Sequence, residues 1–143
     1  MPGGSEPLIP LQWQPVPGCE NALVFPLIRK VDTVSSNSYI VQTPDAVVLI
    51  DPGGLPDQAA HLASVVRAIR AEKARPLVVF LTHAHVDHFM GALSAPALTE
   101  PGTAVVAAQD SGAKALESAD TTLTQANLLG QKIFPMRIDL RLL

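Results

Sequence analysis

The sequence predicts an α/β fold, and three features of its pattern support that prediction. Short runs of β-branched and apolar residues, separated by turn residues, occupy much of the first half of the chain. One amphipathic helix pattern lies between two of these runs. The run after the helix, 77–81, is apolar at every position, as in a strand that is covered on both faces. Strand, helix and strand in this order predict a parallel pair with a right-handed crossover.

An extended, proline-rich arm is expected at 1–21, ahead of a single domain at 22–143. Five prolines within 1–17 remove backbone donors and disfavour a helix there. Trp13 is expected to anchor the arm by packing on the domain. A length of 143 residues suits one domain with a moderate core.

Strands are expected ahead of the helix, and the turn pair Pro44-Asp45 joins two of them into a hairpin. These strands are 22–31 with an interruption at Pro26, 38–43, and 46–51. A helix is expected over 56–73, because proline is accepted in a first helical turn and apolar residues then recur on one face. The residues of that face are Leu62, Val65, Val66 and Ile69.

The second half of the chain is expected to continue with short elements. A short helix at 90–95 and a strand at 103–108 come first. Asp110 and Asp120 are suitable N-caps, and they predict helices of about 8 and 10 residues. Gly130 suits the end of the second helix. Alternation of apolar and charged residues predicts a last strand at 136–142 with one buried face.

Composition excludes several classes of function. The net charge is −3 and no cluster of lysine or arginine occurs, so nucleic-acid binding through a basic patch is not expected. No secretory signal and no apolar run of about 20 residues is found, so we expect a cytoplasmic protein without a membrane span. The single cysteine, Cys19, rules out an intramolecular disulfide and fits a reducing compartment.

The apolar content points to burial beyond an ordinary small core. Hydrophobic residues make up 48% and charged residues 16% of the chain, whereas about 25% charged residues are usual. Either the chain forms a homo-oligomer or a larger assembly, or its core is rich in alanine, valine and leucine.

The stretch Thr82-His83-Ala84-His85-Val86-Asp87-His88 holds three of the four histidines of the chain and follows the buried run directly. Imidazole nitrogens suit zinc and iron, and aspartate adds an anionic oxygen. His83 and His85 lie two apart in extended backbone, so their side chains can point to the same side. We therefore predict a metal site formed by His83, His85, Asp87 and His88. His61, near the start of the helix, is expected to lie outside it.

This motif, His83-x-His85-x-Asp87-His88, preceded by Leu49-Ile50-Asp51-Pro52-Gly53, resembles the metallo-β-lactamase superfamily over about residues 22–143. The resemblance implies the first half of an αββα sandwich. It implies that His83 and His85 belong to a first metal site and that Asp87 and His88 belong to a second. Asp87 is also the expected catalytic residue. Asp51 resembles the supporting acid of the family, although it is also a simple strand-terminating turn residue.

The resemblance implies a hydrolase with one or two zinc ions, in which metal-bound hydroxide attacks the carbonyl of an ester, thioester, lactone or β-lactam-type small molecule. A histidine at position 88 is similar to the glyoxalase II-like and B3-like branches. A mononuclear iron branch, the persulfide dioxygenases, has a similar motif, so iron and that reaction stay open. The substrate is not indicated.

The later histidines of the family have no counterpart after His88. Asp110, Asp120 and Asp139 follow, but each has a local explanation as a cap or as the polar face of a strand. The chain is therefore expected to be an N-terminal half of a longer enzyme, to work with a complementing chain, or to be a non-catalytic metal-binding or assembly module. The four motif residues around a single ion are a further arrangement that the ligand count allows.

Overall fold

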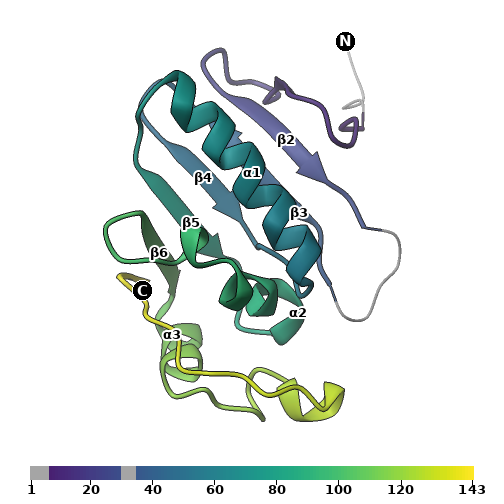
Figure 1. Cartoon of the computed structure of the whole chain (residues 1–143), viewed down its shortest axis with the longest axis vertical. Coiled ribbons are helices and arrows are strands. Elements are labelled where there is room, and N and C mark those ends of the chain that lie inside the picture. Colours follow the sequence, from purple (N-terminus) through teal and green to yellow (C-terminus); the bar gives the residue numbers. More distant parts are fainter. Residues whose placement is uncertain (1–6, 30–34) are drawn as a thin grey trace.

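The computed structural model describes residues 7–29 and 35–143, and the structural statements below concern these residues. Seven strands form one mixed sheet whose spatial order follows the chain, from β1 to β7 (Figure 1). The pairings from β1 to β4 are antiparallel, and those from β4 to β7 are parallel. The strands are β1 (Gln14–Pro15), β2 (Leu23–Leu27), β3 (Ser38–Gln42), β4 (Val47–Ile50), β5 (Leu77–Leu81), β6 (Ala104–Gln109) and β7 (Leu140–Leu142).

The helices are short except for the one between β4 and β5. They are α1 (Pro56–Glu72), α2 (Val86–Phe89) and α3 (Asp110–Glu117), with the 3₁₀ helices η1 (Met90–Ser94), η2 (Pro96–Leu98) and η3 (Ala126–Leu129). The predicted α/β class is confirmed, as are the β3–β4 hairpin and the parallel pairing of β4 with β5. The end of the first predicted strand, Val31, lies outside the described residues.

Helix α1 lies across one face of the sheet (Figure 1). Its buried side includes Leu62, Val66 and Ile69, as the periodicity predicted, whereas Val65 is only partly buried. The strand residues that belong to the same core include Ile40, Leu49, Val79 and Val106, which form one cross-strand row and are fully buried. Burial of such side chains stabilises the fold by about 1.5–3 kcal/mol each.

The other face of the sheet is also apolar but is more accessible, and we call it the open face. Its eleven residues occupy two rows in register, one from β2 to β6 and the other from β2 to β7, and none of them is charged. Val105 and Leu140 are 40% and 49% exposed, whereas side chains of the helix-covered row are fully buried. Val24, Pro26 and Ala107 are the buried members of the open face. The open face consists of Val24, Val41, Val48, Val78 and Val105 in one row and Pro26, Tyr39, Ile50, Phe80, Ala107 and Leu140 in the other.

The proline-rich arm contributes the edge strand β1, which pairs with β2. The Trp13 ring packs on Phe25 with the ring centroids 5.4 Å apart, as expected of an anchor. No helix among the described residues has the length and apolar character needed to cross a bilayer.

The predicted helix of about ten residues after Asp120 is wrong. The chain forms turns there, followed by the four-residue η3. The Asp120 carboxylate does accept backbone N–H groups, from Thr122 and Leu123 at 2.9 and 2.8 Å, but it caps a turn. Gln125 then has a φ of 64°, which a right-handed helix cannot contain. Gly130 does end η3 in the left-handed region, as predicted.

The predicted last strand is shorter than expected, and its predicted buried face is only partly confirmed, because Met136 and Ile138 pack on the core whereas Leu140 and Leu142 are exposed. Only Leu140–Leu142 pairs with the sheet, and all three residues are exposed. Asp139 forms an ion pair with Arg137, and its carboxylate accepts the Val106 N–H at 2.9 Å. A side chain therefore takes the acceptor role that a backbone carbonyl would have in a longer strand. Asp110 is the first residue of α3 rather than its N-cap, and it pairs with Lys114.

Candidate metal centre

The predicted ligands lie together beyond the carboxyl end of β5. His83 and His85 lie in the loop after the strand, and Asp87 and His88 belong to α2. The His83 and His85 rings meet edge to face with centroids 4.7 Å apart, and the His83 and His88 centroids are 3.8 Å apart. The three imidazoles therefore form one cluster, as the spacing predicted.

Asp51 follows β4, the neighbouring strand, and its carboxylate connects the two strand ends. It is 5% exposed, and it accepts the backbone N–H of Thr82 at 2.9 Å. Its other oxygen accepts the Thr82 hydroxyl at 2.6 Å and lies 2.9 Å from Nδ1 of His88. A φ of 52° places Asp51 in the left-handed region, where aspartate is among the tolerated residues. Asp51 thus fixes His88 and Thr82 by hydrogen bonds from the buried side of the cluster.

These contacts determine which ring nitrogens remain available. Nδ1–H of His88 donates to the Asp51 carboxylate, so Nε2 is the His88 nitrogen that a metal ion could bind once it carries no proton. The Thr82 hydroxyl hydrogen is used by Asp51, so its oxygen accepts from Nδ1–H of His83 at 3.1 Å. His83 therefore also presents Nε2. Thr82, for which the sequence indicates no role, sets the tautomer of a predicted ligand.

The protonation of two imidazoles is shifted in opposite directions. Burial lowers the pKa of His83, and the neighbouring His88 and His85 lower it further. Burial would also lower the pKa of His88, but the hydrogen bond and the charge of Asp51, with the charge of Asp87, outweigh it and raise that pKa. His83 is thus favoured in the neutral form that binds a metal ion, whereas His88 keeps its second proton to a higher pH and a metal ion would have to displace it.

The side chains form a cluster without closing around a single point. Asp87 lies near His88, with its carboxylate 3.6 Å from Nε2. Within 7–29 and 35–143, no three histidine, cysteine, aspartate or glutamate side chains are arranged to hold one ion. The donor set nevertheless suits zinc, since Thr82 and Asp51 hold Nδ1 of His83 and of His88 and leave Nε2 of each ring for an ion. Binding would require rotation of side chains about the fixed backbone.

Backbone contacts fix α2 against the turn after Asp51. The N–H of Gly53 donates to the His88 carbonyl at 3.0 Å, and the N–H of Gly91 donates to the Gly53 carbonyl at 2.9 Å. A Cβ atom at Gly91 would lie 2.6 Å from the Leu55 carbonyl oxygen. Only glycine allows this approach, so Gly91 is part of the support of the cluster.

Replacement of Gly91 by alanine is therefore expected to destabilise the fold by about 1–3 kcal/mol, because backbone must move to relieve the overlap. Gly112→Ala is the matched control, since a Cβ there would lie 3.5 Å from the Ala84 Cβ, an ordinary contact. Denaturant unfolding of both variants measures the difference. Equal stabilities of the two variants would contradict the prediction.

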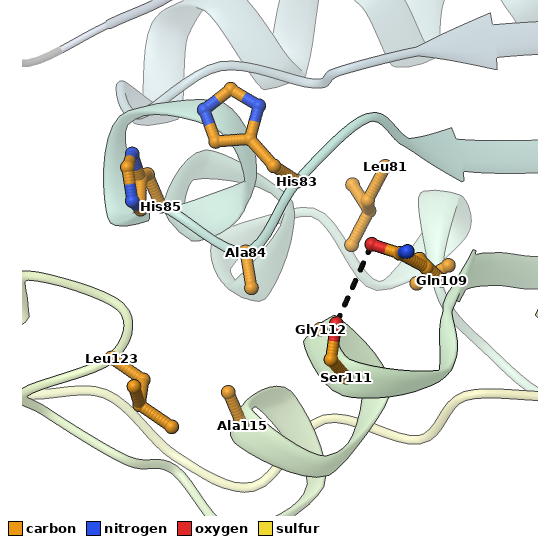
Figure 2. A pocket seen from close by; sticks show the side chains of 10 residues that line it. Leu81, His83, Ala84, His85, Gln109, Ser111, Gly112, Ala115 and Leu123 are labelled. Atoms are coloured by element: carbon orange, nitrogen blue, oxygen red, sulfur yellow. Dashed lines mark hydrogen bonds between the residues drawn. The ribbon is translucent and has the colours of Figure 1, made fainter.

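A pocket of about 220 Å³ adjoins the cluster. It lies between the loop with His83 and His85 and helix α3, and Leu123 approaches from the facing segment (Figure 2). Gln109 and Ser111, which share a hydrogen bond of 3.4 Å, supply its other polar groups. Its remaining walls are apolar or glycine: Leu81, Ala84, Ala108, Gly112, Ala115 and Leu123. No sequence signal marked Gln109 or Ser111.

The remaining candidates lie away from the cluster. His61 packs edge-on against Phe25, with centroids 6.2 Å apart, as its position on α1 predicted. Cys19 is exposed in the arm. Asp110 and Asp139 form ion pairs with arginine or lysine side chains, and Asp120 caps a turn.

The α/β fold thus brings histidines and an aspartate beyond a buried parallel strand together with an acid that follows the neighbouring strand. Residues 31–126 match the family model described as the metallo-beta-lactamase superfamily. This range is most of the chain, and the chain belongs to that superfamily. The resemblance of the His83 to His88 motif is thereby confirmed at the level of the family.

Solved structures of similar fold agree with this assignment. The metallo-beta-lactamase FIM-1 from Pseudomonas aeruginosa, in a mono-zinc form, has a TM-score of 0.55 and 16% identity; the match covers 94% of this chain and 51% of that one. FEZ-1 from Legionella gormanii has a TM-score of 0.59 and 18% identity, with coverage of 85% and 43%. A Hirschia baltica enzyme has a TM-score of 0.54 and 18% identity, with coverage of 94% and 52%. The chain thus spans about half the length of these structures.

Proposed function

We propose that this chain carries the histidine part of the metal centre of a zinc-dependent hydrolase. The observation that supports this most directly is the pair of imidazoles, His83 and His88. Their Nδ1 atoms are hydrogen-bonded to Thr82 and Asp51, which leaves Nε2 of each ring as the nitrogen that could bind an ion. Membership of the superfamily supports metal-dependent hydrolysis, and the mono-zinc form of a similar fold supports zinc.

In this proposal His83, His85 and His88 hold the ion, with Asp87 as a further ligand and as the group that orients a water molecule. Zinc in such a site supplies a Lewis acid and lowers the pKa of bound water. Asp51 and Thr82 keep the rings in the tautomers that ligation needs. The further ligands of a complete site would come from residues other than His83, His85, Asp87 and His88. The hydrolytic activity of the whole enzyme is likewise proposed.

The substrate in this proposal is a small molecule with an ester, thioester, lactone or β-lactam-type carbonyl. The pocket beside His83 and His85 supports this class, since a volume of about 220 Å³ suits a small group. Its walls carry no carboxylate, lysine or arginine. An uncharged part of the substrate would therefore lie against α3, where a charged group would lose its hydration without gaining a partner of opposite charge.

Zinc binding is the first test of the proposal. The protein is stripped with a chelator, reloaded, and its metal content measured by elemental analysis. We expect the unaltered protein to retain zinc. We expect His83→Ala to weaken the zinc affinity by about 10–100-fold or more, because even loss of a group that only orients a ligand has an effect of that size. Turnover of chromogenic esters, thioesters and β-lactams by the reloaded protein tests the hydrolase part.

His61→Ala is the matched control, because it removes an exposed imidazole on α1. Absence of retained zinc in the unaltered protein, or an equal loss of affinity in both variants, would refute the metal centre. Preferential retention of iron would redirect the reaction from hydrolysis to oxygen chemistry.

We also propose that the open face is covered in an assembly by a second copy of the chain or by a complementing chain. Eleven uncharged residues, eight of them partly or fully exposed, cross six strands there, a span of about 24 Å at the usual strand spacing. Apolar patches of this extent commonly mark interaction sites. A non-catalytic assembly module would use the same face, and a zinc-loaded protein without turnover on any carbonyl substrate would favour that alternative.

A further inference from the structure

Gln58, in the first turn of α1, is an amide buried beside the metal centre, and its residue is only 4% exposed. Its neighbours Ser35 and Ser38 are 3% and 0% exposed. No buried side-chain nitrogen or oxygen of the described residues lacks a hydrogen-bond partner, so the three polar groups satisfy one another and nearby backbone. Burial of an amide and two hydroxyls in a small core requires a structural or functional reason.

The hydrogen bonds of Gln58 are directional. Its Nε2 donates to the Ser36 carbonyl at 2.9 Å and to Oγ of Ser38 at 2.7 Å. Its Oε1 accepts the Ser35 hydroxyl. Because the Ser36 carbonyl can only accept, the amide must present Nε2 there, which fixes its orientation.

This orientation reaches Asp51 through a single hydroxyl. Oγ of Ser38 accepts from Gln58, so its own hydrogen is free to donate to the backbone carbonyl of Asp51 at 2.5 Å. Oγ of Ser35 meanwhile accepts the N–H of Gly54 at 3.0 Å. Both ends of the turn 51–54 are thereby held by hydroxyls that Gln58 orients.

Two further contacts place this network under the site. A Cβ atom at Gly53 would lie 2.4 Å from Nε2 of Gln58, so the amide packs directly against the turn. The N–H of Ser36 donates to the carbonyl of Asp87 at 2.9 Å. The network thus connects α1 to the backbone of both Asp51 and Asp87.

We propose that Gln58 is a positioning residue of the metal centre, which holds Asp51 in its left-handed conformation through Ser38 and thereby aligns His88. This inference rests on the proposed function of the cluster. A residue with positive φ is stable only where its surroundings determine it. On the Gln58 side of the turn, two hydrogen bonds hold this conformation: that of the Ser38 hydroxyl to the Asp51 carbonyl and that of the Gly54 N–H to Oγ of Ser35.

Gln58→Met keeps the length and volume of the side chain and removes every polar contact. In the metal-free protein, we expect the Nδ1–H proton signal of His88 to broaden or disappear in the NMR spectrum, because the Asp51 carboxylate is no longer aligned. In the zinc-loaded protein, we expect an affinity roughly tenfold lower by chelator competition. Gln131→Met, which replaces an exposed glutamine, is the control. We expect it to change neither the His88 proton signal nor the zinc affinity.

A second pair of variants separates positioning from simple loss of stability. Ser38→Ala removes the hydroxyl that reaches Asp51, whereas Ser38→Thr retains it. We expect the alanine variant to reproduce both effects and the threonine variant to restore the His88 signal. An unchanged His88 signal in folded Gln58→Met, or in Ser38→Ala where Gln58→Met does not fold, would overturn the inference.

The outcome can be separated from that of the proposed function. If the unaltered protein retains no zinc, the metal centre is refuted, and the His88 signal alone decides whether Gln58 aligns Asp51. If zinc is retained but neither variant changes its affinity or the His88 signal, only the role of Gln58 is refuted.

Discussion

Replacement of Asp51 by asparagine is expected to weaken zinc binding by about 10–100-fold, the usual effect of losing a carboxylate that orients a ligating histidine. The carboxylate accepts three hydrogen bonds, from the Thr82 N–H, the Thr82 hydroxyl and Nδ1 of His88. Asparagine has one acceptor oxygen, and its NH₂ group would face donors. We also expect the free energy of unfolding to fall by about 1–3 kcal/mol, because buried donors lose their partner.

Asparagine is the informative replacement because it tolerates a positive φ as well as aspartate does. The backbone of the turn is therefore preserved, and the effect reports the carboxylate. Asp45→Asn, in the exposed β3–β4 turn, is the matched control. Chelator competition gives the affinity and denaturant unfolding gives the stability. Affinities equal to that of the control would show that Asp51 is only a turn residue.

A glutamate in place of Val78 is expected to dissociate the proposed assembly. Val78 lies in β5, in the middle strands of the open face, paired across the sheet with Val48 and Val105. A charge buried there without a partner costs several kcal/mol, and in a two-fold symmetric dimer it occurs twice. We expect the dissociation constant to rise by roughly 100-fold or more. Light scattering over a range of concentrations measures the mass.

Two variants control for this result. Ser64→Glu places the same charge on the exposed side of α1 and is expected to leave the mass unchanged. Val105→Glu lies on the open face at a position already 40% exposed, so it tests the interface with less risk to the fold. A monomeric mass for the unaltered protein at all concentrations would refute a homo-oligomer and leave the complementing chain.

The cluster and its supporting acid could be predicted because their signals are local or topological. Three histidines within six residues can only lie together, and a parallel strand pair brings Asp51 to the same sheet edge. Thr82 could not be assigned a role, because its effect depends on which partner receives its hydroxyl hydrogen. Gln58 could not be found either, because a polar residue in a first helical turn is ordinary in sequence.

The second half of the chain shows the opposite case. Asp120 is a residue type that commonly caps helices, but the residues after it lack an apolar stripe by which a helix could pack on the core. Alternation in 136–142 suggests a strand, yet the side chains of Arg137 and Asp139 both hydrogen-bond to the backbone of β6, as does the Asp139 N–H. Only three residues are then left in regular strand pairing. Local pattern specifies an element only where tertiary burial agrees with it.

The contacts around the cluster also bear on the order in which its parts can form. The hydrogen bonds described between the acid, the amide network and the histidines join residues from Ser35 to Gly91. The N–H of Val86, between His85 and Asp87, donates instead to the carbonyl of Thr124 at 2.9 Å. The loop that carries the histidines therefore reaches its final contacts only after β6 and α3, which precede Thr124 in the chain, have been synthesised.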